Sequence, residues 1–267
     1  MSTTSPKGTA LITGASSGIG AVYAQRLAAR GYNLILVARN RARLDAVATR
    51  LAAETGRKVD ILEADLTHKA GMQRVEQRLR SDTSIELLVN NAGFGAVSPL
   101  LASDPDRMEE MIALNVTALT RLAHAAAPAF AARGRGTIVN IASIVALAPE
   151  VLNGTYGASK AYVLAFTQSM QHELAGKGVR VQAVLPGATR TEFWDVAGNP
   201  AENLPGEIVM SAEDMVDAAL AGLDAGEVVT IPALEPAGAW ENYNAARLAL
   251  GPQLSRSKPA ARYRKAA

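Results

Sequence analysis

Short apolar runs alternate with longer amphipathic stretches along most of the chain. Runs rich in β-branched and aliphatic residues predict strands, the first around Leu11 and Ile12 and the others at 32–38, 59–64, 85–89, 137–141, 179–185 and 228–231. Apolar residues at helical spacing predict helices at 21–30, 41–55, 69–80, 105–133, a stretch that carries Tyr156 and Lys160 and ends near 175, a stretch capped by Ser211, and 240–250. This alternation predicts a parallel sheet with helices on both faces.

The predicted fold class is α/β: a Rossmann-like, doubly wound parallel sheet of about seven strands. No linker-like stretch interrupts residues 1–267, so we expect a single domain. Within it, we expect 188–210 to form a substrate loop and 237–267 to form a C-terminal helix and basic tail. In sheets of this kind, ligands bind outside the carboxyl ends of the strands. The residues that follow the strands therefore carry the functional information.

Composition narrows the classes of function. Apolar residues make up 49% of the chain, and 27 basic against 25 acidic residues leave a net charge of +2, which gives no field suited to nucleic acid. The absence of cysteine excludes disulfides and zinc–thiolate sites, and His68, His124 and His172 are too scattered to predict a metal site. The N-terminus lacks the apolar stretch of a signal peptide, and no apolar run is long enough to span a bilayer. We therefore expect a soluble cytoplasmic protein with no membrane, nucleic-acid or metal partner.

A glycine-rich turn follows the first predicted strand. Gly14, Gly18 and Gly20 stand between that strand and the first predicted helix. Glycines let the backbone approach a ligand closely, and the amides at a helix N-terminus favour an anion such as a pyrophosphate. A strand-to-helix turn also needs glycine for steric reasons, so this turn alone leaves both a nucleotide site and a purely structural turn open.

Ser143, Tyr156 and Lys160 form the most informative group of polar residues. Tyr156 and Lys160 are four residues apart on a predicted helix, so their side chains share one face. Because an ammonium beside a phenol favours the phenolate, we expect Lys160 to lower the pKa of Tyr156 and make it a general acid or base. Ser143, at a strand end, is suited to donate a hydrogen bond to a substrate oxygen. A chance pairing of Tyr and Lys on one helix face is the alternative.

Together these segments resemble the short-chain dehydrogenase/reductase family over nearly the whole chain. The matching motifs are TGASSGIG at 13–20, NNAG at 90–93, YGASK at 156–160 and PGATRT at 186–191, with Asn115 and Ser143 in the expected order. The resemblance implies that Tyr156 donates a proton to a carbonyl, or takes one from an alcohol, while Ser143 polarises that oxygen. It also implies that Lys160 binds the nicotinamide ribose, and that Asn115 kinks its helix and holds a water connecting Lys160 to solvent. An ordinary exposed helix residue is the alternative for Asn115.

The same resemblance implies a dinucleotide site along the carboxyl edge of the sheet. Its expected residues, besides Tyr156 and Lys160, are Gly14, Ser16, Ser17, Gly18, Ile19, Gly20, Arg39, Asp65, Leu66, Asn91, Ala92, Gly93, Pro186, Gly187, Thr189 and Thr191. Arg39 follows the second strand, where NAD-binding sheets carry an acidic residue and an arginine accommodates a 2′-phosphate. We therefore expect NADP(H) as the preferred cofactor. NAD(H) is the alternative if Arg39 and Arg41 are only solvated charges.

The substrate is less well defined than the cofactor. The expected walls beside Ser143 and Tyr156 are Val145, Val151, Phe193 and Trp194, with Phe94, Leu147 and Leu152 as further candidates. An apolar pocket of this kind suits a hydrophobic ketone or aldehyde. The alternative for Phe193 and Trp194 is packing in the core or at a subunit contact, and a 3-oxoacyl thioester is an alternative substrate.

Two further hypotheses compete with a carbonyl reductase or alcohol dehydrogenase. A non-catalytic dinucleotide-binding sensor has no need for the three polar residues together, and the modest length disfavours a sugar-nucleotide epimerase or dehydratase. The basic end is interpreted as a solvated terminus rather than a tail for an anionic partner, and comprises Arg256, Lys258, Arg262, Arg264 and Lys265. From the family resemblance we expect a homodimer or homotetramer formed through the long helices that hold Asn115 and Tyr156.

Overall fold

The computed structural model describes residues 7–264 and contains one seven-stranded sheet in which every pair of neighbours is parallel. The strands are β1 (Thr9–Thr13), β2 (Asn33–Ala38), β3 (Val59–Glu63), β4 (Ile85–Asn90), β5 (Gly136–Ile141), β6 (Val179–Val184) and β7 (Val229–Thr230). Their order is β3-β2-β1-β4-β5-β6-β7, so the chain direction across the sheet reverses between β1 and β4. In sheets with this order, the crevice at the reversal is where ligands bind.

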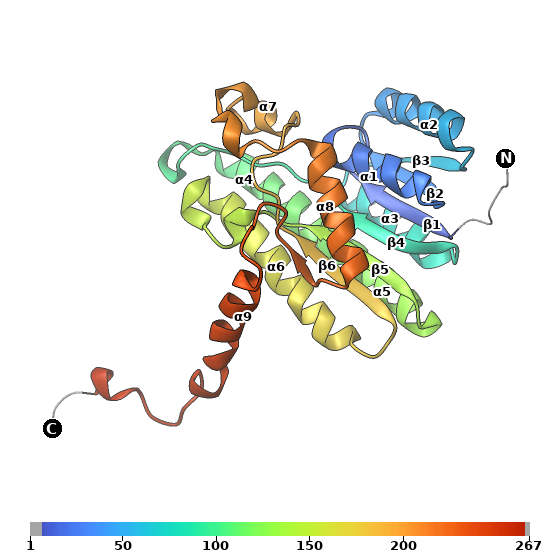
Figure 1. Cartoon of the computed structure of the whole chain (residues 1–267). Helices are drawn as coiled ribbons and strands as arrows, with labels where there is room; N and C mark the ends of the chain where they lie inside the picture. Colours follow the sequence, from blue (N-terminus) through green and yellow to red (C-terminus); the bar gives the residue numbers. More distant parts are fainter. Residues whose placement is uncertain (1–6, 265–267) are drawn as a thin grey trace. The chain divides into compact units, whose positions relative to one another are not determined.

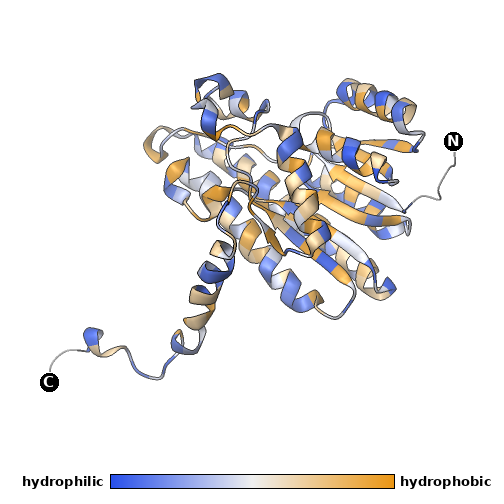
Figure 2. Ribbon diagram, viewed as in Figure 1, coloured by the Kyte–Doolittle hydropathy of each residue, from blue (hydrophilic) through white to orange (hydrophobic). Residues whose placement is uncertain are grey.

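Helices cover both faces of this sheet (Figure 1). The helices of the first unit are α1 (Gly18–Ala29), α2 (Arg41–Thr55), α3 (Lys69–Ser81), α4 (Pro105–Ile112), α5 (Leu119–Arg133), α6 (Gly154–Leu174), α7 (Phe193–Ala197) and α8 (Ala212–Ala225), and the C-terminal part of the chain holds α9 (Ala239–Ala249). One core cluster packs the sheet against α1, α2 and α8, and a second packs it against α3, α5 and α6. Figure 2 shows the strands between these layers as mostly hydrophobic, as expected for strands buried on both faces. The predicted fold class is confirmed.

The helix predicted over 105–133 is wrong as one continuous α-helix. It ends as α4 at Ile112, passes through a π-helical turn at Ala113–Ala118, and resumes as α5 at Leu119. The buried side chain of Asn115 lies in the π-helical turn and bonds to the backbone of Phe94 instead of facing solvent. Turns of this kind are often found at functional sites, because the widened helix turn re-aims one side chain.

The predicted substrate loop, residues 188–210, contains more structure than its sequence indicates. It holds α7 and two short 3₁₀ turns, Ala201–Asn203 and Gly206–Ile208. The loop ends where Ser211 caps α8, its hydroxyl accepting a hydrogen bond of 2.9 Å from the backbone N–H of Asp214, as predicted.

The chain divides into two compact units, the first ending at Pro232 and the second beginning at Ala233. The second unit holds α9, which buries none of its residues. Lys265 of the predicted basic end, and residues 1–6 of the N-terminus predicted to lack a signal peptide, lie outside the described residues. Between residues 7 and 264, no helix combines the length and apolar character needed to cross a bilayer.

Candidate active site

Ser143, Tyr156 and Lys160 meet at the carboxyl end of β5. Ser143 follows that strand, and α6 carries the other two residues. Asn153 starts α6, its side-chain oxygen accepting hydrogen bonds from the backbone N–H groups of Thr155 (2.9 Å) and Tyr156 (3.2 Å). This N-cap fixes where the helix begins, and therefore which way the Tyr156 ring points.

A chain of buried side chains holds α6 against the sheet below the site. The amide of Asn90 on β4 donates to Asn140 on β5 (3.0 Å), and the amide of Asn140 donates to the hydroxyl of Thr167 on α6 (2.9 Å). All three residues are buried. Sequence reasoning missed the roles of Asn140 and Thr167, although two amides at equivalent positions of neighbouring strands are a readable signal for such a contact.

Tyr156 is nearly fully buried, with 6% of its surface exposed. Burial raises its pKa to about 12, against the smaller lowering effect of its hydrogen bond with Ser143. This net rise is opposite in direction to the lowering expected from Lys160, because taking the phenolate out of water is the largest effect on the pKa of Tyr156. At neutral pH the Tyr156 hydroxyl is protonated and is ready to donate.

Lys160 lies beneath Tyr156 and reaches back to the strand. Its Nζ donates a 2.9 Å hydrogen bond to the carbonyl of Ile141 and lies 5.7 Å from the centroid of the Tyr156 ring. Burial lowers the pKa of this ammonium to about 8, because the charged form loses its hydration. A Cβ added to Gly93 would lie 3.5 Å from Nζ, so the NNAG segment passes close to this amine.

Asn115 connects the π-helical turn to both the NNAG segment and α6. Its side-chain oxygen accepts from the backbone N–H of Phe94 (3.1 Å), and its amide donates to the Phe94 carbonyl (2.9 Å) and to the Ser159 hydroxyl (3.1 Å). At 1% exposure it is not an ordinary surface residue. In this structure Asn115 positions the segments around Lys160, and Ser159, which sequence reasoning missed, completes that contact.

The glycine-rich turn is tightly packed. Gly14 and Gly18 adopt left-handed backbone with φ of 66° and 52°, and a Cβ added to Gly20 would lie 2.2 Å from the carbonyl oxygen of Gly14. The amide of Asn91 donates to the carbonyls of Thr13 (2.9 Å) and Gly14 (3.2 Å), which ties the turn to β4. These glycines are therefore required for close packing, whether or not a ligand binds.

The N-terminus of α1 behind this turn is free of side-chain capping. Its N-cap residue is Ser17, whose hydroxyl makes no capping hydrogen bond. Ser16 lies in the same turn, and Ile19 is the second residue of α1. An uncapped helix N-terminus with glycine backbone beside it fits the pyrophosphate of a dinucleotide, because its amide groups point at the anion.

Thr13 is a site residue that sequence reasoning missed. Its hydroxyl accepts from the backbone N–H groups of Asn91 and Ala92, both at 3.0 Å, and donates to the Val89 carbonyl. The side chain is 1% exposed. Thr13 thereby joins the ends of β1 and β4 across the point where the chain direction reverses, and a threonine at a buried strand end is the only sequence signal for it.

Arg39 and Asp65 lie together at the ends of β2 and β3. The Arg39 guanidinium is 4.0 Å from the Asp65 carboxylate and the side chain is 72% exposed, so its remaining donors face solvent. Burial raises the pKa of Asp65. Hydrogen bonds from Thr67 and the charge of Arg39 together lower this pKa by more than burial raises it, so the net pKa is below its usual range. Leu66, also an expected cofactor residue, is buried beside Asp65. An exposed arginine at this position fits a 2′-phosphate.

The segment after β6 joins the glycine-rich turn to the substrate loop. Pro186 accepts hydrogen bonds from the backbone N–H of Ile144 (3.0 Å) and from Ser143, and Gly187 accepts one from Thr189. The Thr191 methyl group would contact a Cβ added to Gly18 at 3.2 Å. Thr191 therefore lies beside the glycine-rich turn, and Pro186 lies beside Ser143.

The expected substrate walls separate into three groups. Val145 is buried against Tyr156, and Phe193 packs on the same cluster. Trp194 is also buried, but its indole N–H donates to the Thr189 carbonyl (3.0 Å), so it anchors the loop. Val151 is largely exposed. Four of the expected residues, Val145, Phe94, Leu152 and Phe193, belong to the apolar cluster that contains Tyr156.

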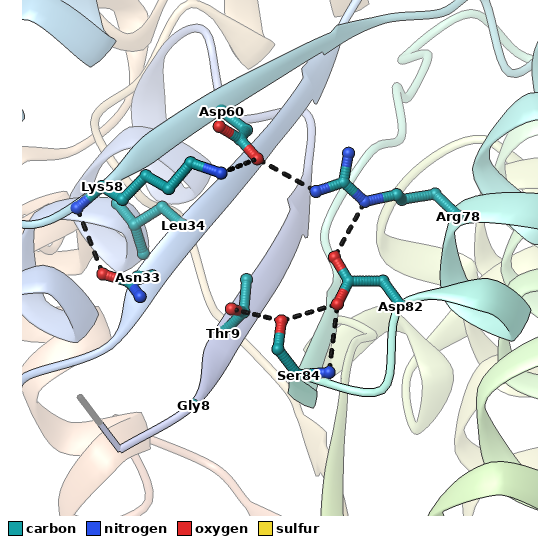
Figure 3. Close-up of a pocket in the computed structure, with 9 residues that line it drawn as sticks. All are labelled: Gly8, Thr9, Asn33, Leu34, Lys58, Asp60, Arg78, Asp82 and Ser84. Atoms are coloured by element: carbon teal, nitrogen blue, oxygen red, sulfur yellow. Dashed lines mark hydrogen bonds and ion pairs between the residues drawn. The ribbon is translucent and has the colours of Figure 1, made fainter. Parts of the chain in front are cut away.

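A polar pocket of about 360 Å³ lies at the opposite, amino end of the strands (Figure 3). Its charged groups pair with one another: Lys58 and Arg78 with Asp60, at 3.2 and 3.0 Å, and Arg78 with Asp82 at 2.9 Å. These ion pairs join β3 to the end of α3 and leave no charged group of the pocket unpaired. Within the described part of the chain, no group of three or more His, Asp or Glu side chains is arranged to hold a metal ion.

Comparison with known proteins identifies relatives of most of the first unit. The family model for short chain dehydrogenases matches residues 8–200. The chain is 37% identical to human 17-beta-hydroxysteroid dehydrogenase type 3 over 186 residues, which is 68% of this chain and 59% of that protein. The chain therefore spans less than two thirds of the length of that relative.

Two solved structures cover 96% of this chain. A short-chain dehydrogenase from Sphingobium yanoikuyae in complex with NADPH is 50% identical, with a TM-score of 0.93 over 100% of that chain. A bulky-bulky ketone specific alcohol dehydrogenase from Comamonas testosteroni is 47% identical, with a TM-score of 0.89 over 98% of that chain. With the motifs and the sheet order described above, these matches show that the chain belongs to the short-chain dehydrogenase family.

Proposed function

We propose that this protein is an NADP(H)-dependent oxidoreductase that interconverts a hydrophobic ketone or aldehyde and the corresponding alcohol. The observation that carries the proposal is the meeting of Ser143, Tyr156 and Lys160 at one strand end, with Tyr156 hydrogen-bonded to Ser143 and the Lys160 amine below it. A dinucleotide sensor would not need this arrangement.

Tyr156 and Ser143 divide the work at the carbonyl oxygen. Tyr156 donates its proton to that oxygen during reduction and accepts one during alcohol oxidation, and its raised pKa keeps the proton in place at neutral pH. Ser143 donates a hydrogen bond to the same oxygen as negative charge develops there. When bound, the nicotinamide supplies the hydride. Lys160 would bind the nicotinamide ribose, and Asn115 holds the segments around Lys160.

The proposed cofactor is supported by the Sphingobium relative, which was solved with NADPH, and by the exposed guanidinium of Arg39. The uncapped N-terminus of α1 and the glycine-rich turn would hold the pyrophosphate. Lys160, with the backbone of Asn91, Ala92 and Gly93, would hold the nicotinamide end. NAD(H) binds the same turn but lacks the 2′-phosphate that Arg39 would contact.

Arg39→Ala is expected to weaken NADPH binding by about tenfold and to leave NADH binding unchanged, because it removes one charge-assisted contact to the 2′-phosphate. Binding is measured as the fluorescence change on titrating each nucleotide into the protein. Arg50→Ala is the matched control, since Arg50 pairs with Glu54 farther along α2. An equal loss for NADPH and NADH would contradict the assignment of Arg39.

The proposed substrates are ketones with apolar groups on both sides of the carbonyl. The support is the apolar cluster around Tyr156, together with the bulky-ketone specificity of the Comamonas relative. A panel of ketones, aldehydes and 3-oxoacyl thioesters, followed by NADPH absorbance, tests this proposal. Turnover of 3-oxoacyl thioesters alone would favour the alternative substrate over a simple ketone. If no carbonyl compound were turned over, the proposed function would be contradicted.

Two further proposals concern assembly, by analogy with the family, and location, from the sequence expectation. We infer a homodimer or homotetramer, which light scattering of the purified protein tests directly. A cytoplasmic location is likewise inferred, and fractionation of the source cells tests it.

A further inference from the structure

The ring of Phe193 covers the catalytic tyrosine. Its centroid lies 5.6 Å from that of Tyr156, with the two planes at 47°. Phe193 is the first residue of α7 in the substrate loop, whereas Tyr156 is held by α6 and the sheet. Because Tyr156 is almost fully buried, a carbonyl reaches its hydroxyl only when one of the covering groups moves.

Gly95 provides the space that the Phe193 ring fills. A Cβ added to Gly95 would lie 3.0 Å from Cε2 of Phe193 and only 2.4 Å from Cζ, a distance at which the ring has to move. Gly95 is not among the glycines with positive φ, so its backbone does not require glycine. The absence of a side chain at this position is therefore explained by the ring.

The backbone that carries Phe193 is anchored on three sides. The Phe193 N–H donates to the Thr191 hydroxyl (3.3 Å), the Trp194 indole donates to the Thr189 carbonyl, and Glu192 pairs with Arg43 at 2.6 Å. With its neighbours held, the part free to move is the ring itself. A ring that swings about its own side-chain bonds can uncover Tyr156 without unfolding α7.

We propose that Phe193 is a specificity-determining gate, seated against Gly95, that makes access to Tyr156 depend on the bulk of the substrate. This inference rests on the proposed carbonyl reduction. Displacing the ring forfeits its aromatic contact with Tyr156. A bulky apolar ketone packs against the displaced ring and replaces the lost contact. A small ketone is too short to make this contact, so the free energy of the ring contact with Tyr156 is lost. The gate thus selects ketones with a large apolar group beside the carbonyl.

Phe193→Ala is expected to raise kcat/KM for 2-butanone by about tenfold while changing kcat/KM for butyrophenone by less than about twofold. The free energy of one aromatic pair corresponds to a change of about tenfold. Gly95→Ala should also favour 2-butanone, because its methyl group displaces the ring. In the double variant the Gly95→Ala effect should vanish, since no ring is left to displace. Val196→Ala is the control, because Val196 lies on α7 with 56% of its surface exposed.

An unchanged ratio of the two ketones in Phe193→Ala would overturn the gate, as would a Gly95→Ala effect that persists in the double variant. Phe193→Leu keeps an apolar side chain and serves if the alanine variant folds poorly. A second readout is the emission of Trp194, which lies edge-on to Phe193 at 5.4 Å, measured in a Trp240→Phe background. Gly95→Ala and added butyrophenone should both shift this emission.

The two readouts separate the gate from the proposed function. Turnover of ketones with an unchanged ratio contradicts the gate alone. Absence of turnover contradicts the function, and the emission of Trp194 then decides whether the ring moves: no shift with Gly95→Ala or with butyrophenone contradicts the gate as well.

Discussion

Tyr156→Phe is expected to lower kcat/KM for ketone reduction by about 10³-fold and to leave the Kd for NADPH within about twofold, because only the proton donor is removed. The aromatic ring stays, so its packing against Val145 and Phe193 is kept. The loss comes from the proton transfer and from the hydrogen bond with Ser143. Steady-state rates from NADPH absorbance and a parallel nucleotide titration measure the two quantities separately.

Tyr23→Phe is the matched control for that experiment. Tyr23 lies on α1, is fully buried, and its hydroxyl has no hydrogen-bond partner within the described structure. Removing this hydroxyl leaves no new unpaired group, so turnover should be unchanged and the free energy of unfolding should rise by about 1 kcal/mol. If Tyr156→Phe turned over ketones at the unmodified rate, Tyr156 would not be the acid and the proposed mechanism would fail.

The sheet and its ligand-binding edge could be predicted because their signals are local. Apolar runs with helical stretches between them indicate a parallel sheet, and the positions directly after the strands place Ser143, Asn91 and Arg39 at its carboxyl edge. The steric reason for glycine, which the sequence left open beside a nucleotide site, is confirmed by the close packing at Gly14 and Gly20. These inferences needed only periodicity, turn chemistry and the rule for open parallel sheets.

What could not be predicted depends on burial and on contacts between distant residues. The spacing of Tyr156 and Lys160 indicated their proximity, but burial, which raises one pKa and lowers the other, is not visible in a spacing. The contact of Arg43 with Glu192 joins residues far apart in sequence, and no pattern in either segment indicates it. No turn motif predicts glycine at position 95, because the need for glycine there comes from the ring of Phe193.

Lys160→Met is expected to lower kcat/KM and NADPH affinity strongly, by about 10²-fold in turnover, and yet to stabilise the folded protein at neutral pH. The ammonium is buried, and the lowering of its pKa from 10.5 to about 8 corresponds to about 3 kcal/mol of cost to the folded state. Methionine fills a similar volume without that cost. The lost hydrogen bond to the Ile141 carbonyl offsets about 1 kcal/mol, so a net gain of about 2 kcal/mol is expected.

The sign of the pH dependence makes this prediction specific. Below pH 8 both the folded and the unfolded chain carry the proton, and the full cost is present. Between about 8 and 10.5 the unfolded chain binds more protons than the folded one, so the free energy of unfolding of the unmodified protein rises with pH. The advantage of Lys160→Met should therefore be largest at pH 7 and shrink steadily towards pH 10, as measured by urea unfolding at several pH values.

Lys177→Met is the control, because Lys177 is exposed just after α6 and should change neither stability nor turnover. A stability difference for Lys160→Met that stays constant from pH 7 to 10 would mean that the amine binds its proton equally in the folded and unfolded chains, so that burial does not lower its pKa. A loss of stability at pH 7 would mean that the contact with Ile141 outweighs the cost of burying the charge. Only a gain that fades with rising pH fits an ammonium held in the core because the reaction requires it there, at the expense of the stability of the fold.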